Sequence, residues 1–181
     1  MAKKLTRKLK EFTPAESIAM VKGLLKRKRS LAKANLKPGH LIFSHYDAKD
    51  KENTYDQTPL VLILRINKSH ILGLNFHWVP FSMRINLVKH IIKINAGAIR
   101  QRKPLKFSYR QLKPMLKSLG YAPVIRLYIR KRFGKQGVVI PNHMLMEMAR
   151  LKTETFTRGR YSAGQMFAMA RAAGKAKNKK R

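Results

Sequence analysis

The sequence predicts an α+β protein in which a small antiparallel β-sheet carries flanking helices and basic terminal extensions. Three observations predict this class. The apolar spacing is helical in the first part of the chain, becomes strand-like from His40 and is helical again after Ser82. Turn signals separate the short apolar runs between these points. With 44% hydrophobic residues the chain can bury a core, and so small a sheet must be curled or covered to hide its edges.

Composition divides the chain into three parts. We expect a basic N-terminal arm and amphipathic helix over residues 1–37, an α+β core domain over 38–151 and a basic C-terminal tail over 152–181. The 41 Lys and Arg exceed the 8 Asp and Glu by +33 charges. Residues 97–151 alone hold 13 basic residues and 1 acidic residue. Such an excess predicts a polyanionic partner.

Several classes of protein are disfavoured. The absence of Cys excludes a disulfide framework, thiolate zinc sites and thiol catalysis. The longest apolar run, Leu60 to Leu64, is far shorter than the ~18 residues that span a bilayer. The chain contains no phosphate loop, nucleophile elbow or dinucleotide fingerprint. We therefore expect no enzyme, cofactor, small-molecule substrate or membrane partner.

Before the sheet, the chain begins with a basic arm and a helix. The first 12 residues lack periodicity and predict a flexible arm. Thr13 and Glu16 form a capping box around Pro14, which suits a first helical position. A basic amphipathic helix is expected over about 14–35, ending before a Lys-Pro-Gly turn.

Three strands are expected next. The first runs from His40 to Tyr46, the second from Pro59 to Ile66 and the third from His70 to Val79. In the third strand, Gly73 marks a place where a side chain would obstruct close packing or a bulge. The last strand is short, from Gly137 to Pro141.

Two helices precede a segment that is ambiguous. Ser82 caps a helix that reaches about Asn95, and Ser108 opens a shorter helix that ends at Gly120. Between Val124 and Phe133, a strand would place alternate basic residues on one face, whereas a helix would have basic residues in its last turn. We favour the helix slightly. The segment after Thr153 is interpreted as a solvated basic tail or one that orders on nucleic acid.

Acidic residues are rare but locally clustered. Asp47, Asp50, Glu52 and Asp56 lie within ten residues, and a metal-dependent phosphodiesterase would need such carboxylates. All four belong to one polar loop, however, and hard-metal ligands usually come from separate elements. The favoured interpretation is structural, with Asp47 and Asp56 capping turns or pairing with Lys and Arg. No metal site is expected.

Basic residues interleaved with aromatic or apolar groups are the main functional signal. They can neutralise phosphates while flat side chains contact sugars or bases. The candidate nucleic-acid-binding residues form a helix group, a loop group and a strip: Lys22, Lys26, Arg27 and Arg29; Arg100, Arg102, Lys103 and Lys106; Arg126, Arg130, Lys131 and Arg132. With no recognition helix and no aromatic ribonucleoprotein motif, we expect phosphate-dominated, sequence-tolerant binding.

A further pattern runs through the middle of the chain. It reads Y-D-x-K, then Y-D-x-x-P-L-V, then L-G-L-N-x-H-W-x-P and an arginine, from Tyr46 to Arg84. This pattern resembles the DNA end protector (DNA terminus protecting, head completion) proteins of T-even-type tailed phages and their cyanophage relatives. The resemblance covers roughly residues 40–150. Its core-motif residues here are Tyr46, Asp56, Gly73, Asn75, His77 and Trp78.

The resemblance implies a structural virion protein that binds the end of packaged double-stranded DNA and shields it from exonuclease. It implies partners at the portal or neck and a location inside the phage head or neck, after assembly in the bacterial cytoplasm. It implies no catalytic residues. Together with the strand count, it also suggests that the sheet curls into a small SH3-like barrel.

Two alternatives remain open. A ribosomal or nucleoid-type protein would also carry basic tails around a small β core, and would prefer A-form RNA. A metal-dependent nuclease or RNase toxin would need Asp47 or Asp56 for cleavage.

Overall fold

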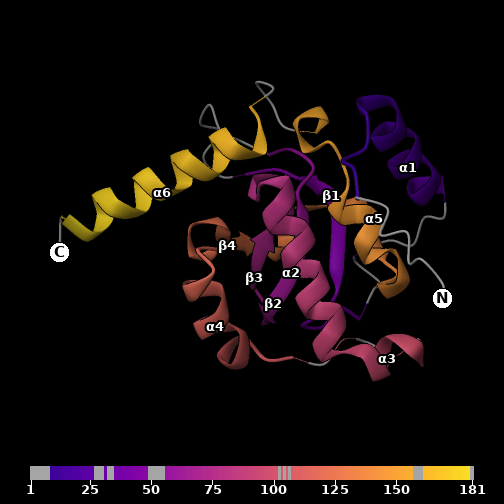
Figure 1. Cartoon of the computed structure of the whole chain (residues 1–181), viewed down its shortest axis with the longest axis horizontal. Helices are drawn as coiled ribbons and strands as arrows, with labels where there is room; N and C mark the ends of the chain where they lie inside the picture. The colour runs from indigo at the N-terminus through magenta and orange to yellow at the C-terminus, as the bar shows by residue number, and fades with distance from the viewer. Residues whose placement is uncertain are drawn as a thin grey trace, which may run out of the picture.

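The computed structural model describes residues 9–26, 31, 35–48, 56–101, 103, 105, 107–156 and 161–179. The strands are β1 (Leu41–Tyr46), β2 (Leu60–Ile66), β3 (His70–Asn75), β4 (Ile125–Ile129) and β5 (Phe133–Ile140). The helices are α1 (Pro14–Lys26), α2 (Phe81–Ile94), α3 (Ala96–Arg100), α4 (Tyr109–Ser118), α5 (Leu145–Ala149) and α6 (Ala163–Lys179), joined in places by short 3₁₀ turns. Figure 1 shows these elements gathered around the sheet, with α6 extending away from it.

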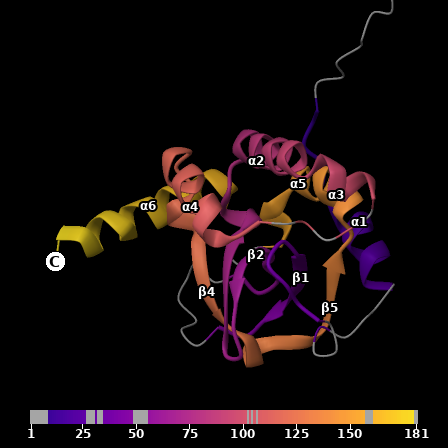
Figure 2. The same cartoon turned by 90° about the horizontal axis from the view of Figure 1, so that it is seen from below.

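The five strands form one antiparallel sheet in the order β4-β3-β2-β1-β5. The sheet is curled, because β1 and β4 make contact although β2 and β3 separate them in this order. The backbone N–H of Ile129 on β4 donates to the Tyr46 hydroxyl on β1, at 3.2 Å. Figure 2 shows the resulting half-barrel below a layer of helices. The predicted class, α+β with a small curled antiparallel sheet and flanking helices, is confirmed.

Both faces of the sheet are buried. Leu41, Leu60 and Leu62 belong to the larger core beneath the helices. Their neighbours Ile42 and Val61 belong to a second, smaller core inside the curl. Side chains alternate between the two faces of a strand, so a strand buried on both faces has a continuous apolar run. This explains the uninterrupted Leu60–Leu64 segment, all of which is buried.

Gly73 lies where β3 approaches β2. A Cβ at this position would collide with the Val61 side chain and stand 3.2 Å from the Leu62 carbonyl oxygen. The Tyr128 ring lies 3.7 Å from the same point. The expectation that a side chain here would obstruct close packing is confirmed.

The slight preference for a helix between Val124 and Phe133 is wrong. The segment forms β4, a 3₁₀ turn η4 (Arg130–Arg132) and the first residue of β5. Pairing of β4 with β3 fixes this conformation and places Tyr128 inside the curl, whereas Leu127 on the opposite side is 64% exposed. Pairing with β3 therefore determines the conformation of a segment whose local sequence pattern is ambiguous.

Other predicted boundaries shift. The third strand ends at Asn75, whose side chain accepts from the His77 N–H and caps the 3₁₀ turn η2 (Phe76–Trp78). Helix α2 begins at Phe81 with Pro80, not Ser82, as its N-cap. The predicted capping box of Thr13 and Glu16 is confirmed, and Ser108 opens α4 as expected, with a capping box to Gln111 that was not predicted. Helix α1 is described from Pro14 to Lys26, and residues 27–30 and 32–34 of the predicted helix lie outside the described residues.

Both predicted extensions are partly ordered against the body. Within the expected flexible arm, the Phe12 N–H donates to the Arg150 carbonyl oxygen at 2.7 Å. Within the expected solvated tail, α6 buries Ala163, Met166 and Ala170. These three residues recur at helical spacing, so one face of α6 docks while its far end projects (Figure 1). Among the described residues, no helix is long and apolar enough to cross a membrane.

Candidate nucleic-acid interface

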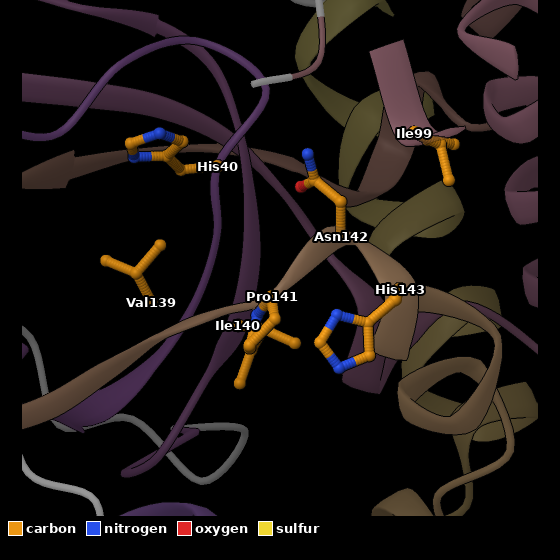
Figure 3. A pocket seen from close by; sticks show the side chains of 7 residues that line it. All are labelled: His40, Ile99, Val139, Ile140, Pro141, Asn142 and His143. Atoms are coloured by element: carbon orange, nitrogen blue, oxygen red, sulfur yellow. The ribbon is translucent and has the colours of Figure 1, made fainter. Parts of the chain in front are cut away.

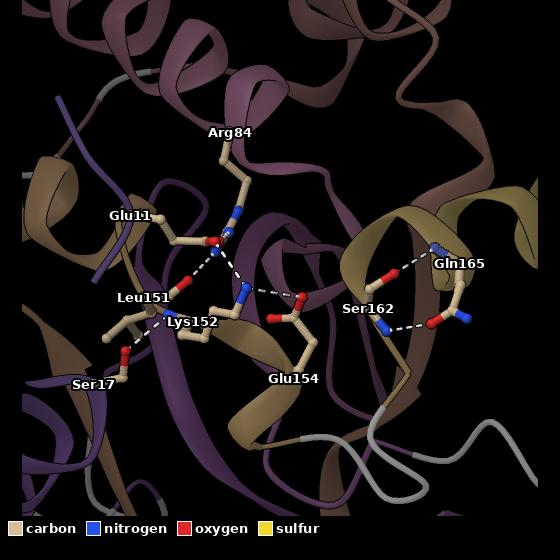
Figure 4. A network of polar contacts seen from close by, with 8 residues as sticks. All are labelled: Glu11, Ser17, Arg84, Leu151, Lys152, Glu154, Ser162 and Gln165. Atoms are coloured by element: carbon tan, nitrogen blue, oxygen red, sulfur yellow. Dashed lines mark hydrogen bonds and ion pairs between the residues drawn. The ribbon is translucent and has the colours of Figure 1, made fainter. Parts of the chain in front are cut away.

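The Arg84 guanidinium forms the centre of a buried ionic cluster. Its side chain is 0% exposed, and Nη2 donates to the Glu11 carboxylate at 2.6 Å. Nη1 donates to the Leu151 carbonyl oxygen at 2.8 Å. Lys152 pairs with Glu11 at 3.3 Å and with Glu154 at 3.6 Å (Figure 4). We call this group of Glu11, Arg84, Lys152 and Glu154 the acidic clamp, because it ties the N-terminal segment to the end of the core.

Burial lowers the pKa of Arg84, while the neighbouring Glu11 carboxylate opposes that shift. A guanidinium remains protonated at neutral pH even so, because its ordinary pKa exceeds 12. The clamp therefore holds one fully buried positive charge, neutralised by an acid that lies 73 residues away in the sequence. Nothing in the local sequence pattern around Arg84 indicates this partner.

Three motif residues converge on a second buried group. The Asp56 carboxylate accepts from Asn75 Nδ2 at 2.8 Å and from the Thr58 N–H at 3.2 Å. Its Oδ2 also lies 3.1 Å from His77 Nδ1. Asp56 is 5% exposed and His77 is 0% exposed, so both groups of this contact are buried. This arrangement fixes the polar loop to the end of β3.

The remaining motif side chains pack in two other places. Trp78 lies under the Arg126 guanidinium, 4.2 Å from the ring centroid. Tyr46 packs in the curl, with ring centroids 5.1 Å from Tyr128 and 4.9 Å from Phe133. The six core-motif residues thus hold strand ends, loops and the inner core together.

The candidate helix group lies on α1, where Lys22 and Lys26 are exposed. Arg27 and Arg29 lie outside the described residues. In the loop group, Arg100 and Lys103 are exposed, and Arg102 and Lys106 lie outside the described residues. These two groups contribute exposed positive charge from separate parts of the chain.

A hollow of about 350 Å³ lies beside the loop group. Ile99 of α3 faces Ile140, Asn142 and His143 at the end of β5, with His40 on another side (Figure 3). Asn142 Nδ2 donates to the Lys103 carbonyl oxygen at 2.8 Å, which ties the loop to this wall. No local sequence pattern indicates this hollow, because its walls come from three separate segments, at His40, at Ile99 and at residues 139–143.

The candidate strip does not form one row of equivalent cations. Arg126 is stacked on Trp78, and burial lowers its pKa. Arg130 donates to the Asn67 carbonyl oxygen at 3.2 Å. Arg132 donates to the Asp47 carbonyl oxygen at 3.1 Å and lies 3.6 Å from its carboxylate. Lys131 is exposed, and none of the described residues forms an ion pair with it.

A second hollow, of about 250 Å³, opens where η4 joins β4 to β5. Its walls are apolar, and its rim is cationic. We call it the barrel mouth, and its wall and rim residues are Leu31, Leu36, Ile71, Phe133, Arg130 and Lys131. It leads into the small core inside the curl, which includes Leu31 and Ile71 and against which Leu36 and Phe133 pack.

The acids of the 47–56 loop do not form a cluster in the described part of the chain. Asp47 lies by Arg132 and Asp56 by His77, and Asp50 and Glu52 lie outside the described residues. Among the residues that can be described, no group of three His, Asp or Glu could hold a metal ion.

A half-barrel fold, acids paired mainly within the body and exposed Lys and Arg on several elements define a small, strongly basic α+β protein. Residues 6–170 match the family model described as Phage T4 terminal DNA protecting protein. The chain therefore belongs to this family of phage proteins that protect DNA ends, which implies a non-enzymatic, structural role. No curated protein and no solved structure matches the chain.

Proposed function

We propose that this protein binds the end of linear double-stranded DNA through phosphate contacts and shields that end from exonuclease. Family membership carries the proposal. The net charge of +33 supports it, because neutralising phosphates and releasing their counterions drives binding to duplex DNA. Exposed Lys22, Lys26, Arg100, Lys103 and Lys131 are the described candidates for those contacts.

The proposed location is the virion, near the portal or neck, where the end of a packaged genome lies. The proposed protein partners are the phage portal, neck or other virion proteins. With 41 basic residues against 8 acidic residues, the chain repels its own copies. Binding to packaged DNA would remove that repulsion.

Binding and protection should be measured together. The DNA substrates are a blunt linear duplex and a covalently closed circle of the same sequence, and a structured RNA serves as the third ligand. Each is titrated with salt, since the slope of log affinity against log salt reports the number of phosphate contacts. Exonuclease digestion of the bound linear duplex then reports protection directly.

We expect tighter binding to the linear duplex than to the circle, with protected ends and a steep loss of affinity at high salt. Equal binding to both DNAs without protection would overturn the proposal and leave a general polyanion binder. Preference for the RNA would support the ribosomal alternative. Cleavage of any substrate with Mg²⁺ or Mn²⁺ would support the nuclease alternative.

A further inference from the structure

Contacts to internal phosphates cannot distinguish the end of a duplex from its middle, because every internal phosphodiester carries the same single charge. Two features belong to an end: an exposed face of the last base pair, and a terminal nucleotide that leaves the stack at the lowest cost. Unstacking costs a few kcal/mol and costs least for a base that is already unpaired. A protein that selects ends needs a surface for one of these features.

The barrel mouth has the chemistry of such a surface. Its walls present the partly exposed apolar groups of Leu36 and Phe133, with the buried Ile71 behind them. Nucleobases bind on apolar and aromatic side chains. A volume of about 250 Å³ is below the ~300–1,000 Å³ typical of sites for drug-sized ligands. The mouth therefore suits one ring system and its sugar rather than a longer segment.

The walls of the mouth are built before any ligand arrives. Phe133 packs on Tyr46 and Tyr128, with ring centroids 4.9 Å and 5.6 Å away. The Tyr46 hydroxyl is held by the Ile129 N–H. Because Gly73 has no side chain, β3 packs closely against Val61 at this point, and the Tyr128 ring lies 3.7 Å from the position that a Cβ would take. A site whose side chains are already ordered loses little entropy on binding.

The rim supplies the matching charge. Arg130 is anchored through one guanidinium nitrogen to the Asn67 carbonyl oxygen, which leaves its positive charge without a paired acid among the described residues. Lys131 follows it directly and is exposed. A phosphate at the rim would lie between two cations, whereas the nearby Asp47 carboxylate is paired with Arg132.

We infer that the barrel mouth receives the terminal nucleotide of the DNA duplex, with its base against the partly exposed Phe133 and Leu36 and its phosphate between Arg130 and Lys131. This inference rests on the proposed function and adds to it the feature by which an end is recognised. The basic groups on α1 and on the 100–103 loop then hold the flanking duplex without selecting its end.

A fluorescent base tests the inference without changing the protein. 2-Aminopurine is placed at the terminal position of a blunt duplex or, in a second duplex, at its centre. We expect binding to change the fluorescence of the terminal probe and to leave the central probe unchanged, because only the terminal base leaves the stack. Equal responses, or no response while the linear duplex is bound, would overturn the inference.

Two variants test the rim and the wall. Lys131→Ala removes a cation at the rim, and Leu36→Trp fills the hollow from its half-buried wall. Lys93→Ala is the matched control, because Lys93 is exposed on α2 away from the mouth. Thermal melting confirms that each variant is folded. If Leu36→Trp does not fold, Lys131→Ala and the terminal probe decide the question.

The ratio of linear to circular affinity is the readout. Loss of one stacked base lowers affinity by roughly 5- to 100-fold, so Leu36→Trp should reduce the ratio by about tenfold. Lys131→Ala should reduce it several-fold, and Lys93→Ala should weaken both DNAs equally. Unchanged ratios in both mouth variants would overturn the inference while the proposed function stands. A wild-type protein with no preference for ends would overturn both.

Discussion

The acidic clamp and the barrel mouth use arginine in opposite ways. Arg84 in the clamp is fully buried and lies 2.6 Å from the Glu11 carboxylate. Arg130 at the mouth is partly exposed and is held by a backbone carbonyl oxygen. A buried charge needs an acidic partner, since removing one partner of a buried pair is strongly destabilising. A charge at the surface can remain available to a ligand.

This difference shows where a chain with only 8 acidic residues places them. Glu11 and Glu154 pair with Lys152 in the clamp, Asp56 is buried beside His77, and Glu16 caps α1. Acids are used mainly where the fold needs them. The exposed cations of α1, of the 100–103 loop and of the barrel mouth are therefore available to bind a polyanion.

The largest effect should come from breaking the clamp. Glu11→Ala leaves the Arg84 charge buried without its acidic partner, and should lower the free energy of unfolding by about 3 kcal/mol. Chemical denaturation measures this loss. Glu16→Ala on the exposed capping box is the matched control and should lower the free energy of unfolding much less than Glu11→Ala does. Equal losses of unfolding free energy in the two variants would show that the buried pair stabilises the fold no more than the exposed capping box does.

A second pair of acids sharpens the comparison between buried and exposed carboxylates. Asp56→Ala leaves Asn75 Nδ2 and the His77 ring without their acceptor, and should cost about 2 kcal/mol of unfolding free energy. Asp47→Ala removes an exposed pair with Arg132 and should cost at most about 0.5 kcal/mol. Thermal melting of the two variants tests this order. A larger loss for Asp47→Ala would contradict it.

The third prediction concerns the exposed lysines of α1. Lys22→Glu and Lys26→Glu on exposed positions of α1 should each weaken binding to linear DNA by roughly tenfold at low salt, equivalent to about 1.4 kcal/mol. The difference from the wild type should shrink as salt rises. The melting temperature should stay nearly constant, since exposed substitutions rarely change stability by more than about 0.5 kcal/mol. Unchanged binding would remove α1 from the interface.

The smallest effect should be a pH dependence at His40. Burial, with a smaller contribution from Lys37, lowers the pKa of His40 below its ordinary 6.5. The unfolded chain then binds more protons just below pH 6.5, so stability present at neutral pH is lost as the pH falls toward the folded-state pKa. His40→Gln should flatten this part of the stability profile, measured by denaturation between pH 7 and pH 5. An unchanged slope would exclude His40 as its source.

Local signals were enough to predict part of the fold. The capping box of Thr13 and Glu16 could be predicted from the sequence because its partners lie three residues apart. The continuous apolar run of β2 could be read because burial on both faces removes the alternation. The convergence of Asp56, Asn75 and His77 was not predicted: the family pattern names the three residues without placing them together, and no spacing rule joins residues 19 and 21 positions apart.

Other parts depend on contacts that local patterns do not contain. The pairing of β4 with β3 requires residues more than 50 positions apart to meet, and it overrides the helical reading of that segment. The clamp joins Glu11 to Arg84, and the mouth gathers its walls from β3, η4, β5 and the segment after α1. Helix α6 docks through Ala163, Met166 and Ala170. Three small or flexible side chains give too weak an apolar pattern for this docking to be predicted from the sequence.

The projecting helix α6 changes the distance over which this protein can capture a ligand. At physiological ionic strength, charges are screened beyond about 8 Å, so the body alone attracts DNA only at close range. Nine residues of α6, 171–179, follow its last buried residue, Ala170, and extend for about 13 Å at ~1.5 Å per residue. Arg171, which is exposed, lies at the start of this projecting part. The helix thus reaches more than one screening length beyond its docked part, which enlarges the radius at which a polyanion can be captured.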